Sequence, residues 1–256
     1  MATSAIVVTF HTGGVLWDCL RAALAQCDEV VVVDNGNPDA VSARLAGDPH
    51  ILHHASPGNV GFGWAANVGA GLAQGTHLLF LNPDAVLRPG AVEALLTALG
   101  DAKAPAIAGA RLVDAAGVEL RGSRRRSLTP LNLLRGLNLH REPLPGGPAP
   151  VGAVSGAAFM VRRADWEALG GFDPAYFLHV EDLDLCWRAH GLGGDVLFVP
   201  GAEAVHAGAT SDAPSWVVET HKLMGLRTYL TRHFPRAGRL AWPAIGAALA
   251  RRRRRG

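Results

Sequence analysis

Short apolar runs rich in Val, Ile and Leu alternate with longer helical stretches over residues 1–105, and this alternation constrains the fold more than any other feature of the chain. A strand followed by a helix, repeated several times, is typical of a parallel sheet with helices packed on its faces. The expected strands lie within residues 4–10, 28–36, 50–54 and 77–85, and the expected helices within residues 15–25, 63–75 and 88–99.

The pattern changes in the second half of the chain, where strands follow one another with turns between them. One stretch is basic and rich in Pro and Gly, which predicts a long loop with one short helix, and long loops in compact domains are usually functional or mobile. The expected elements are a strand, turn and strand in 106–120, the long loop in 121–152, a strand in 154–163, a short helix in 164–172 and a pair of strands in 195–208.

The chain of 256 residues is long enough for one domain with a sizeable core, and 49% hydrophobic residues indicate a globular protein. Its three cysteines, Cys19, Cys27 and Cys186, have no disulfide-framework spacing, which favours reduced thiols and a cytoplasmic location. The N-terminus lacks the basic and apolar regions of a signal peptide. The longest apolar run near the C-terminus, 240–250, is shorter than the ~20 residues of a membrane-spanning helix.

Polar side chains stand at the ends of the expected strands. Thr9, Phe10 and Asp34 follow the first two strands, and the turn Asn82–Asp84 follows the fourth. The carboxyl ends of parallel strands share one edge, where ligands bind, so we expect these residues to meet there. A carboxylate at Asp84 can hold Mg²⁺ or Mn²⁺, which in turn holds a diphosphate. The alternative is an Asx-type turn that bonds the local backbone, and Asp34 likewise either binds a base or ribose or ends its strand.

A glycine motif precedes the third expected helix. Gly61, Gly63 and Ala66 satisfy the G-x-G-x-x-A dinucleotide fingerprint, and Asp84 lies about 20 residues further on. That fingerprint belongs after the first strand, whereas here it follows the third, which argues against a dinucleotide site. The alternative is that the small residues let a helix approach the sheet, or let Asn59 and Gly61 approach a nucleotide.

Three carboxylates, Glu181, Asp182 and Asp184, stand at the start of another helical stretch. Acids at this position interact favourably with the helix dipole, and Asp184 four residues before Arg188 predicts an ion pair. This explains Asp184, but it does not explain why Glu181 and Asp182 are both present, so one of them is a candidate general base. His206 follows the last expected strands and is an ordinary loop histidine unless a metal is bound nearby.

The order of these motifs resembles the family 2 glycosyltransferases of the GT-A fold, and more narrowly their bacterial rhamnosyltransferase-type branch. Each motif is weak alone, but seven in this order, from Ala5 to Ser211, are specific. They are VVTF, VVVDNG, GNVGFGWAANVG, FLNPDA, SGAAFMVRR, GGFDPAYFLHVEDLDLCWRAHG and VPGAEAVHAGATS. The resemblance implies one α/β domain of the GT-A (Rossmann-like) type, with a mixed, mainly parallel sheet flanked by helices. Residues 1–105 would bind the nucleotide sugar, 106–235 would bind the acceptor and carry catalysis, and 236–256 would form a basic amphipathic tail.

The resemblance also implies an inverting, metal-dependent transfer of a sugar, such as L-rhamnose from dTDP-rhamnose, to a hydroxyl of a glycan or polyprenyl-linked acceptor. Asp182 matches the general base, with Glu181 beside it. Asp84 and His206 match positions that hold Mg²⁺ or Mn²⁺, and Asn82 replaces the first acid of the D-x-D motif of the family. The implied donor-site residues are Thr9, Phe10, Asp34, Asn59, Gly61, Asn82, Asp84, Trp187 and Arg188.

Two departures from the family pattern leave the substrate open. His11 stands where this branch often has Asn, and FLHVED at 177–182 replaces a more aromatic segment. The alternatives are a transferase that uses a UDP- or GDP-sugar and, from a different class, a non-catalytic nucleotide-sugar-binding protein or a membrane-docked scaffold.

The C-terminal stretch, residues 238–256, joins a short apolar segment to five arginines, Arg251–Arg255. This combination suits peripheral docking on an anionic membrane surface, at the inner face of the cell membrane. A solvated tail explains it equally well. No interleaving of aromatic and basic residues supports a nucleic-acid partner.

Overall fold

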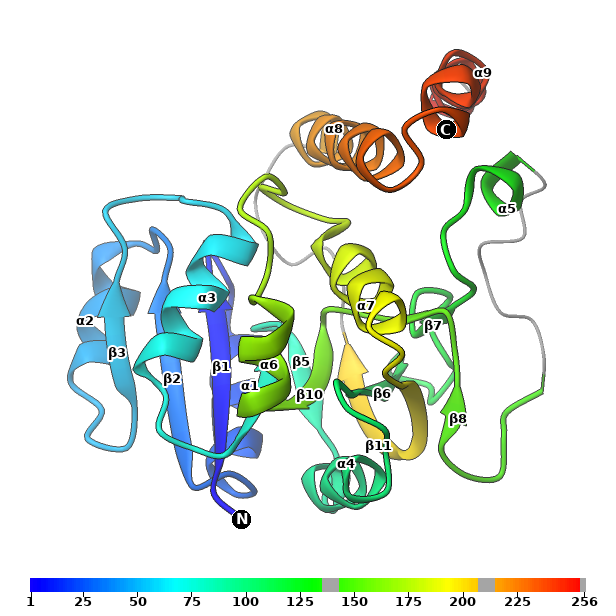
Figure 1. Cartoon of the computed structure of the whole chain (residues 1–256). Helices are drawn as coiled ribbons and strands as arrows, with labels where there is room; N and C mark the ends of the chain where they lie inside the picture. The colour runs from blue at the N-terminus through cyan, green and yellow to red at the C-terminus, as the bar shows by residue number, and fades with distance from the viewer. Residues whose placement is uncertain (135–142, 207–214, 254–256) are drawn as a thin grey trace.

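The computed structural model describes residues 1–134, 143–206 and 215–253. Four parallel strands form its N-terminal half, and each apolar run predicted as a strand is one (Figure 1). They are β1 (Thr3–Thr9), β2 (Glu29–Asp34), β3 (Leu52–Ala55) and β4 (His77–Leu81). Their spatial order, β3-β2-β1-β4, reverses at β1, which is the kind of switch point that opens a ligand crevice at the carboxyl ends of the strands.

The remaining strands, one from the end of the N-terminal half and the others from the C-terminal half, extend the same sheet with mixed directions. They are β5 (Ala85–Leu87), β6 (Ile107–Val113), β8 (Ala149–Pro150), β10 (Ala158–Arg162) and β11 (Val196–His206). Beyond β4 the order is β10-β6-β11-β5, with β8 paired to β11, and β10 is antiparallel to both of its neighbours. A separate ribbon pairs β7 (Arg124–Arg125) with β9 (Ala153–Val154). The predicted mixed sheet is therefore confirmed, with parallel pairing throughout β1–β4 and again between β6 and β11.

Helices cover both faces of the sheet because every long strand alternates apolar side chains between the faces. Ala5 and Val7 of β1 join one core cluster, and Ile6 and Val8 join the other. The first face carries α1 (Val15–Leu24), α2 (Asp39–Ala46) and α4 (Ala91–Gly100). The second carries α3 (Phe62–Leu72), α6 (Arg163–Leu169), α7 (Glu181–Gly191) and α8 (Ser215–His233).

Some elements differ from the sequence prediction. The expected strand pair in 195–208 is one strand, β11, whose pairing with β6 shifts register between Val199 and Glu203. α2 was not predicted because it buries only Leu45 fully and so lacks an apolar stripe. The long loop contains the predicted short helix, α5 (Pro130–Leu134), and the C-terminal stretch is helical in α9 (Ala237–Arg253). Arg254 and Arg255 of the predicted basic tail lie outside the described residues.

Within the described parts of the chain, no helix combines the length and the apolar character needed to cross a lipid bilayer. Figure 1 shows α8 and α9 together beyond the edge of the sheet at which β1 and β2 end.

Candidate active site

The carboxyl ends of β1 and β2 lie side by side, because Thr9 and Asp34 are register partners. The hydroxyl of Thr9 lies 3.3 Å from Oδ1 of Asn37, in the loop after β2. Phe10 continues from β1 and meets the ring of His11 edge-on, with 4.6 Å between the ring centroids. The structure therefore brings Thr9, Phe10 and Asp34 to one edge, as predicted from the topology.

The buried carboxylate of Asp34 makes its hydrogen bonds to residues that follow it closely in the chain. It accepts hydrogen bonds from the N–H groups of Gly36 (3.1 Å) and Asn37 (2.9 Å), from the amide of Asn37 (2.7 Å) and from the hydroxyl of Ser42. Burial raises the pKa of Asp34, but these hydrogen bonds outweigh burial and hold the pKa below its usual value. Asp34 therefore braces the loop after β2, and its contact with a base or ribose stays a prediction.

A pair of asparagines ties the end of β2 to the loop before α3. Nδ2 of Asn35 donates to Oδ1 of Asn59 at 2.9 Å, and the N–H of Val60 donates to Oδ1 of Asn35 at 3.0 Å. Gly61, at the start of α3, has φ +88°, and a Cβ built there would lie 2.6 Å from the carbonyl oxygen of Phe177. Only glycine allows this approach. Sequence reasoning missed Asn35, although it follows Asp34 directly in VVVDNG.

The turn after β4 meets the end of β11. His206 pairs with Ala85 in the β11–β5 ladder, which places its ring beside the turn. Nε2 of His206 lies 3.1 Å from Oδ1 of Asp84 and 3.4 Å from Nδ2 of Asn82. Asp84 is buried, with 5% of its surface exposed. The structure thus brings together the two predicted metal ligands, which are 122 positions apart in the numbering.

These side chains are a partial ligand set for a divalent cation. A carboxylate and an amide oxygen are donors that Mg²⁺ and Mn²⁺ prefer, and an imidazole can join them. No group of three or more His, Cys, Asp or Glu side chains with metal-binding geometry occurs among residues 1–134, 143–206 and 215–253. Asp84 and His206 are therefore two protein side chains that could hold a divalent cation, and they do not form a complete ligand set by themselves.

Asp182, in the first turn of α7, is held by two donors from distant parts of the chain. Its Oδ2 accepts from Nη2 of Arg125, on β7, at 2.5 Å and from the N–H of Gly156 at 3.0 Å. The side chain is 13% exposed, so it still reaches solvent. Sequence reasoning described the loop that contains Arg125 as basic but did not pair Arg125 with Asp182.

Residues 156 and 157 connect Asp182 to the Asn82–Asp84 turn. Gly156 donates to Asp182, and the next carbonyl, of Ala157, accepts a 2.8 Å hydrogen bond from the N–H of Asn82. The segment lies just before β10, which is antiparallel to β4, so it reaches the sheet edge where β4 ends. The general-base candidate and the Asp84–His206 pair are therefore joined at one edge through two consecutive residues.

Glu181 differs sharply from Asp182, although the two are adjacent. Its residue surface is 6% exposed, and Oε2 has no hydrogen-bond partner in the described part of the chain. Burial, followed by the negative charge of Asp182, raises the pKa of Glu181 from 4.5 to about 8. Burial thus favours the protonated form of Glu181, which makes it a poorer candidate for the base than Asp182.

Asp184 and Arg188 form the predicted ion pair, with Nε of Arg188 2.7 Å from Oδ2 of Asp184. The guanidinium also donates to the carbonyl oxygens of Leu169 and Gly171. Asp184 is fully buried and lies 2.7 Å from Nε2 of His233 on α8. Burial raises the pKa of Asp184, but the contacts with His233 and Arg188 outweigh it and lower the pKa below its usual value. These contacts fasten α7 to the end of α6 and to α8.

Trp187 packs against the C-terminal end of α8 and the residue after it. Its ring lies 4.9 Å from that of Phe234 and 5.9 Å from that of His233, measured between centroids. The structure thus gives Trp187 and Arg188 partners that join helices, and their predicted place in the donor and acceptor pocket stays a prediction.

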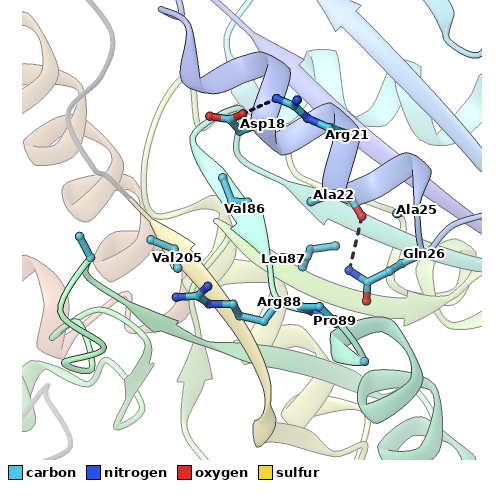
Figure 2. Close-up of a pocket in the computed structure, with 12 residues that line it drawn as sticks. Asp18, Arg21, Ala22, Ala25, Gln26, Val86, Leu87, Arg88, Pro89 and Val205 are labelled. Atoms are coloured by element: carbon cyan, nitrogen blue, oxygen red, sulfur yellow. Dashed lines mark hydrogen bonds and ion pairs between the residues drawn. The ribbon is translucent and has the colours of Figure 1, made fainter.

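An open hollow of about 900 Å³ lies beside this site, between α1, β5 and the start of α4 (Figure 2). Val86 and Val205, which face each other in the β5–β11 ladder, line it together with Arg21 and Arg88. None of the predicted site residues lines this hollow.

Comparison with known proteins decides the family. The family described as glycosyl transferase family 2 matches residues 4–169, which is well over half of the chain. The chain belongs to glycosyl transferase family 2. The matched region contains Thr9, Asp34 and Asp84, whereas Asp182 and His206 lie beyond it.

Among curated relatives of this family 2 chain is the N-acetylglucosaminyl-diphospho-decaprenol L-rhamnosyltransferase of Mycobacterium tuberculosis (strain ATCC 25618 / H37Rv). It is 28% identical over 253 aligned residues, which cover 85% of this chain and 80% of the relative. The rhamnosyltransferase WbbL of Escherichia coli (strain K12) is 38% identical over 52 residues, or 20% of each chain.

Solved structures of glycosyltransferases share the fold. GalNAc-T7 with UDP, GalNAc and Mn²⁺ superposes with a TM-score of 0.68 at 15% identity; the match covers 89% of this chain and 47% of that one. S. aureus TarS 1-349 in complex with UDP-GlcNAc superposes with a TM-score of 0.58 at 15% identity, covering 90% and 66% of the two chains. At these identities the likeness shows the GT-A fold alone.

Proposed function

We propose that this family 2 glycosyltransferase is inverting and metal-dependent, and that it moves L-rhamnose from dTDP-rhamnose to a hydroxyl of a lipid-linked glycan acceptor. The observation that carries the proposal is that Asp182 and the Asp84–His206 pair meet at one sheet edge, bridged by Gly156 and Ala157. The sugar and the acceptor are supported by the mycobacterial relative, an N-acetylglucosaminyl-diphospho-decaprenol L-rhamnosyltransferase that aligns with 85% of the chain.

Asp182 is the proposed general base. It takes the proton of the acceptor hydroxyl as that oxygen forms a bond to C1 of the sugar on the face opposite the diphosphate. The bond from C1 to the diphosphate oxygen breaks, and the nucleoside diphosphate leaves with that electron pair, so the configuration at C1 is inverted. Arg125 and the N–H of Gly156 orient the carboxylate of Asp182 through Oδ2. Oδ1 accepts a hydrogen bond from the N–H of Leu183 and keeps its second lone pair for the hydroxyl.

Asp84 and His206 are the proposed protein ligands of Mg²⁺ or Mn²⁺, with Asn82 beside them. When bound there, the cation offsets the negative charge that develops on the leaving diphosphate. Thr9, Phe10, Asp34, Asn59 and Gly61 form the rest of the proposed donor site, because they lie along the same edge of the sheet.

A lipid-linked acceptor requires the enzyme to work at a membrane surface. We therefore place the protein in the cytoplasm, in peripheral contact with the inner face of the cell membrane. The basic C-terminal tail, residues 236–256, supports this placement through its charge.

The variant Asp182→Asn tests the base. It keeps the size of the side chain and removes its ability to take a proton, so turnover should fall by roughly 10²- to 10⁴-fold, the usual contribution of a general base. Donor affinity, measured by calorimetry with Mg²⁺ or Mn²⁺, should stay unchanged. Asp101→Asn, at an exposed position after α4, is the matched control. Near-normal turnover of Asp182→Asn would remove Asp182 as the base.

The donor is tested separately by titrating the unaltered protein with dTDP-rhamnose and with UDP- and GDP-sugars in the presence of either metal. Tighter binding of a UDP- or GDP-sugar than of dTDP-rhamnose would replace rhamnose as the proposed sugar and leave the assignment of the base intact.

A further inference from the structure

Positive charge is concentrated at the C-terminal end of the chain, far beyond what the small net charge suggests. Residues 215–256 contain ten Lys and Arg residues and one acid, Glu219, for a net charge of +9. Residues 1–214 contain fourteen Lys and Arg residues against 21 acids, for a net charge of −7. The protein is therefore an electric dipole whose positive end is the segment that includes α8 and α9.

One face of α8 is exposed and combines large apolar side chains with a basic one. Trp216 is 62% exposed and Met224, two turns further on, is 61% exposed. Arg227 is also exposed, and it lies on the same face because it follows Trp216 by eleven residues and Met224 by three. The opposite face is buried against the rest of the protein through Gly225, Leu226, Tyr229 and Leu230.

The start of α9 also exposes a large apolar side chain beside basic ones. Leu240 is 83% exposed and follows two exposed arginines, Arg236 and Arg239, by four residues and one residue. α8 and α9 pack against each other and stand together in Figure 1. Exposed Trp, Met and Leu beside arginines are typical of helices that lie in the interface of a bilayer.

The α8–α9 surface, which we define as Trp216, Met224, Arg227, Arg236, Arg239 and Leu240, stands close to the site. Across α8, the ring of His221 stacks on that of Phe177, with 4.5 Å between centroids, and Phe177 precedes Asp182 by five residues. Both α8 and the proposed donor site lie at the edge where β1 and β2 end (Figure 1). A membrane against α8 would therefore be next to the catalytic edge.

We propose that the α8–α9 surface docks on an anionic lipid bilayer, with Trp216, Met224 and Leu240 in the interface and the arginines against lipid phosphates. The charge separation selects this partner, because an anionic surface attracts the positive end and repels the body, which turns the catalytic edge toward the lipid. The inference deepens the proposed function only in that a lipid-linked acceptor would be presented at this edge. Docking itself does not depend on the sugar or the acceptor.

The test is co-sedimentation of the full chain with vesicles of phosphatidylcholine alone or with phosphatidylglycerol added. The unaltered protein should bind only the anionic vesicles and should be released by salt. Trp216→Ser with Met224→Ser should weaken binding at least tenfold, and Arg227→Gln with Arg239→Gln should weaken it by about fivefold per arginine. Val118→Ser with Leu192→Ser is the matched control, because these side chains are 61% and 59% exposed in other parts of the fold, and its binding should be unchanged.

Three results would overturn the proposal. One is absence of binding to anionic vesicles, and another is equal binding by the Trp216 and Met224 variant and the control. The third is that the variant alters only the oligomeric state in sedimentation, which would make the surface a contact between copies of the chain.

A variant with Arg251–Arg255 replaced by Gln separates the contribution of the tail from that of α8. Transfer to a water-soluble acceptor should persist in the α8 variants, so a failure of docking is distinguishable from a failure of the proposed function.

Discussion

Glu181 and Asp182, adjacent residues at the start of α7, differ in burial and in hydrogen bonding. Asp182 accepts hydrogen bonds from Arg125 and Gly156 and reaches solvent, whereas Glu181 is buried with an unpartnered oxygen. Of the two side chains, only that of Asp182 reaches solvent and can contact an acceptor. The raised pKa of Glu181 disfavours a second negative charge beside the proposed base.

This difference predicts a pH dependence of stability. The pKa of Glu181 is 4.5 in its ordinary state and about 8 in the fold, so between these values the folded protein holds one proton more than the unfolded chain. The free energy of unfolding should therefore fall as pH rises through this window, by at most about 1.4 kcal/mol per pH unit from this group. Glu181→Gln should remove this slope in urea unfolding series at pH 5 to 8. Glu167→Gln, at an exposed site on α6, should keep it, and an identical slope in both variants would contradict the prediction.

Asp84 gives a second prediction at this scale. Asp84→Ala removes the carboxylate beside His206, so donor binding should lose its dependence on metal. We expect a loss of at least the 10- to 100-fold that follows removal of a residue that merely supports a metal ligand. Calorimetry of donor binding with and without Mn²⁺ measures it, with Asp101→Ala at the exposed position after α4 as the control. Unchanged metal-dependent affinity would mean that Asp84 does not hold the cation.

At the scale of elements, α8 packs closely against the loop that precedes Asp182. His179 and Val180 have φ of 66° and 75°, a left-handed conformation that is strained for non-glycine residues. A Cβ added at Gly225 of α8 would lie 3.0 Å from the carbonyl oxygen of His179 and 3.2 Å from a methyl of Val180. Contacts between α8 and the 177–180 loop thus hold the start of α7 in place.

Gly225→Ala should therefore lower both stability and kcat. Alanine favours a helix over glycine by up to about 1 kcal/mol, but overpacking costs roughly 1–3 kcal/mol, so the net change should be destabilising. Gly71→Ala in α3 is the matched control, because open space surrounds that position, and it should stabilise the protein. Unfolding curves and turnover at saturating substrate measure both effects. If the two alanine variants change stability and turnover equally, the close packing of α8 against the 177–180 loop does not hold the start of α7 in place.

At the scale of the whole molecule, the two proposed halves share one core. β4 of the donor half pairs with β10 of the acceptor half, and the ring of Phe80 on β4 lies 4.8 Å from that of Phe159 on β10. Phe80 also packs against Trp166 at 4.4 Å. Residues 1–105 and 106–235 therefore form one folding unit, and the division between them concerns function only.

This interleaving predicts a single unfolding transition. Phe80→Ala should lower the free energy of unfolding by about 3–5 kcal/mol, because it opens a cavity in the shared core. Hydrogen exchange should lose protection in β1 and in β10 together. Separate loss of protection in the N-terminal strands would mean that the halves fold independently.

The sequence alone determined the order of the four parallel strands and of α1, α3 and α4 over residues 1–105, and the sheet edge that carries Thr9, Asp34 and Asp84, because apolar periodicity is a local signal. It also pointed to Asp182 through its motif. Tertiary structure decided which of Glu181 and Asp182 is the better base candidate. The burial of Glu181 and the contact of Asp182 with Arg125, 57 positions away, cannot be seen in the spacing of residues along the sequence. Tertiary structure also decided that Arg188 and Trp187 join helices and that α8 has one exposed apolar face, since both depend on packing between segments that are distant along the chain.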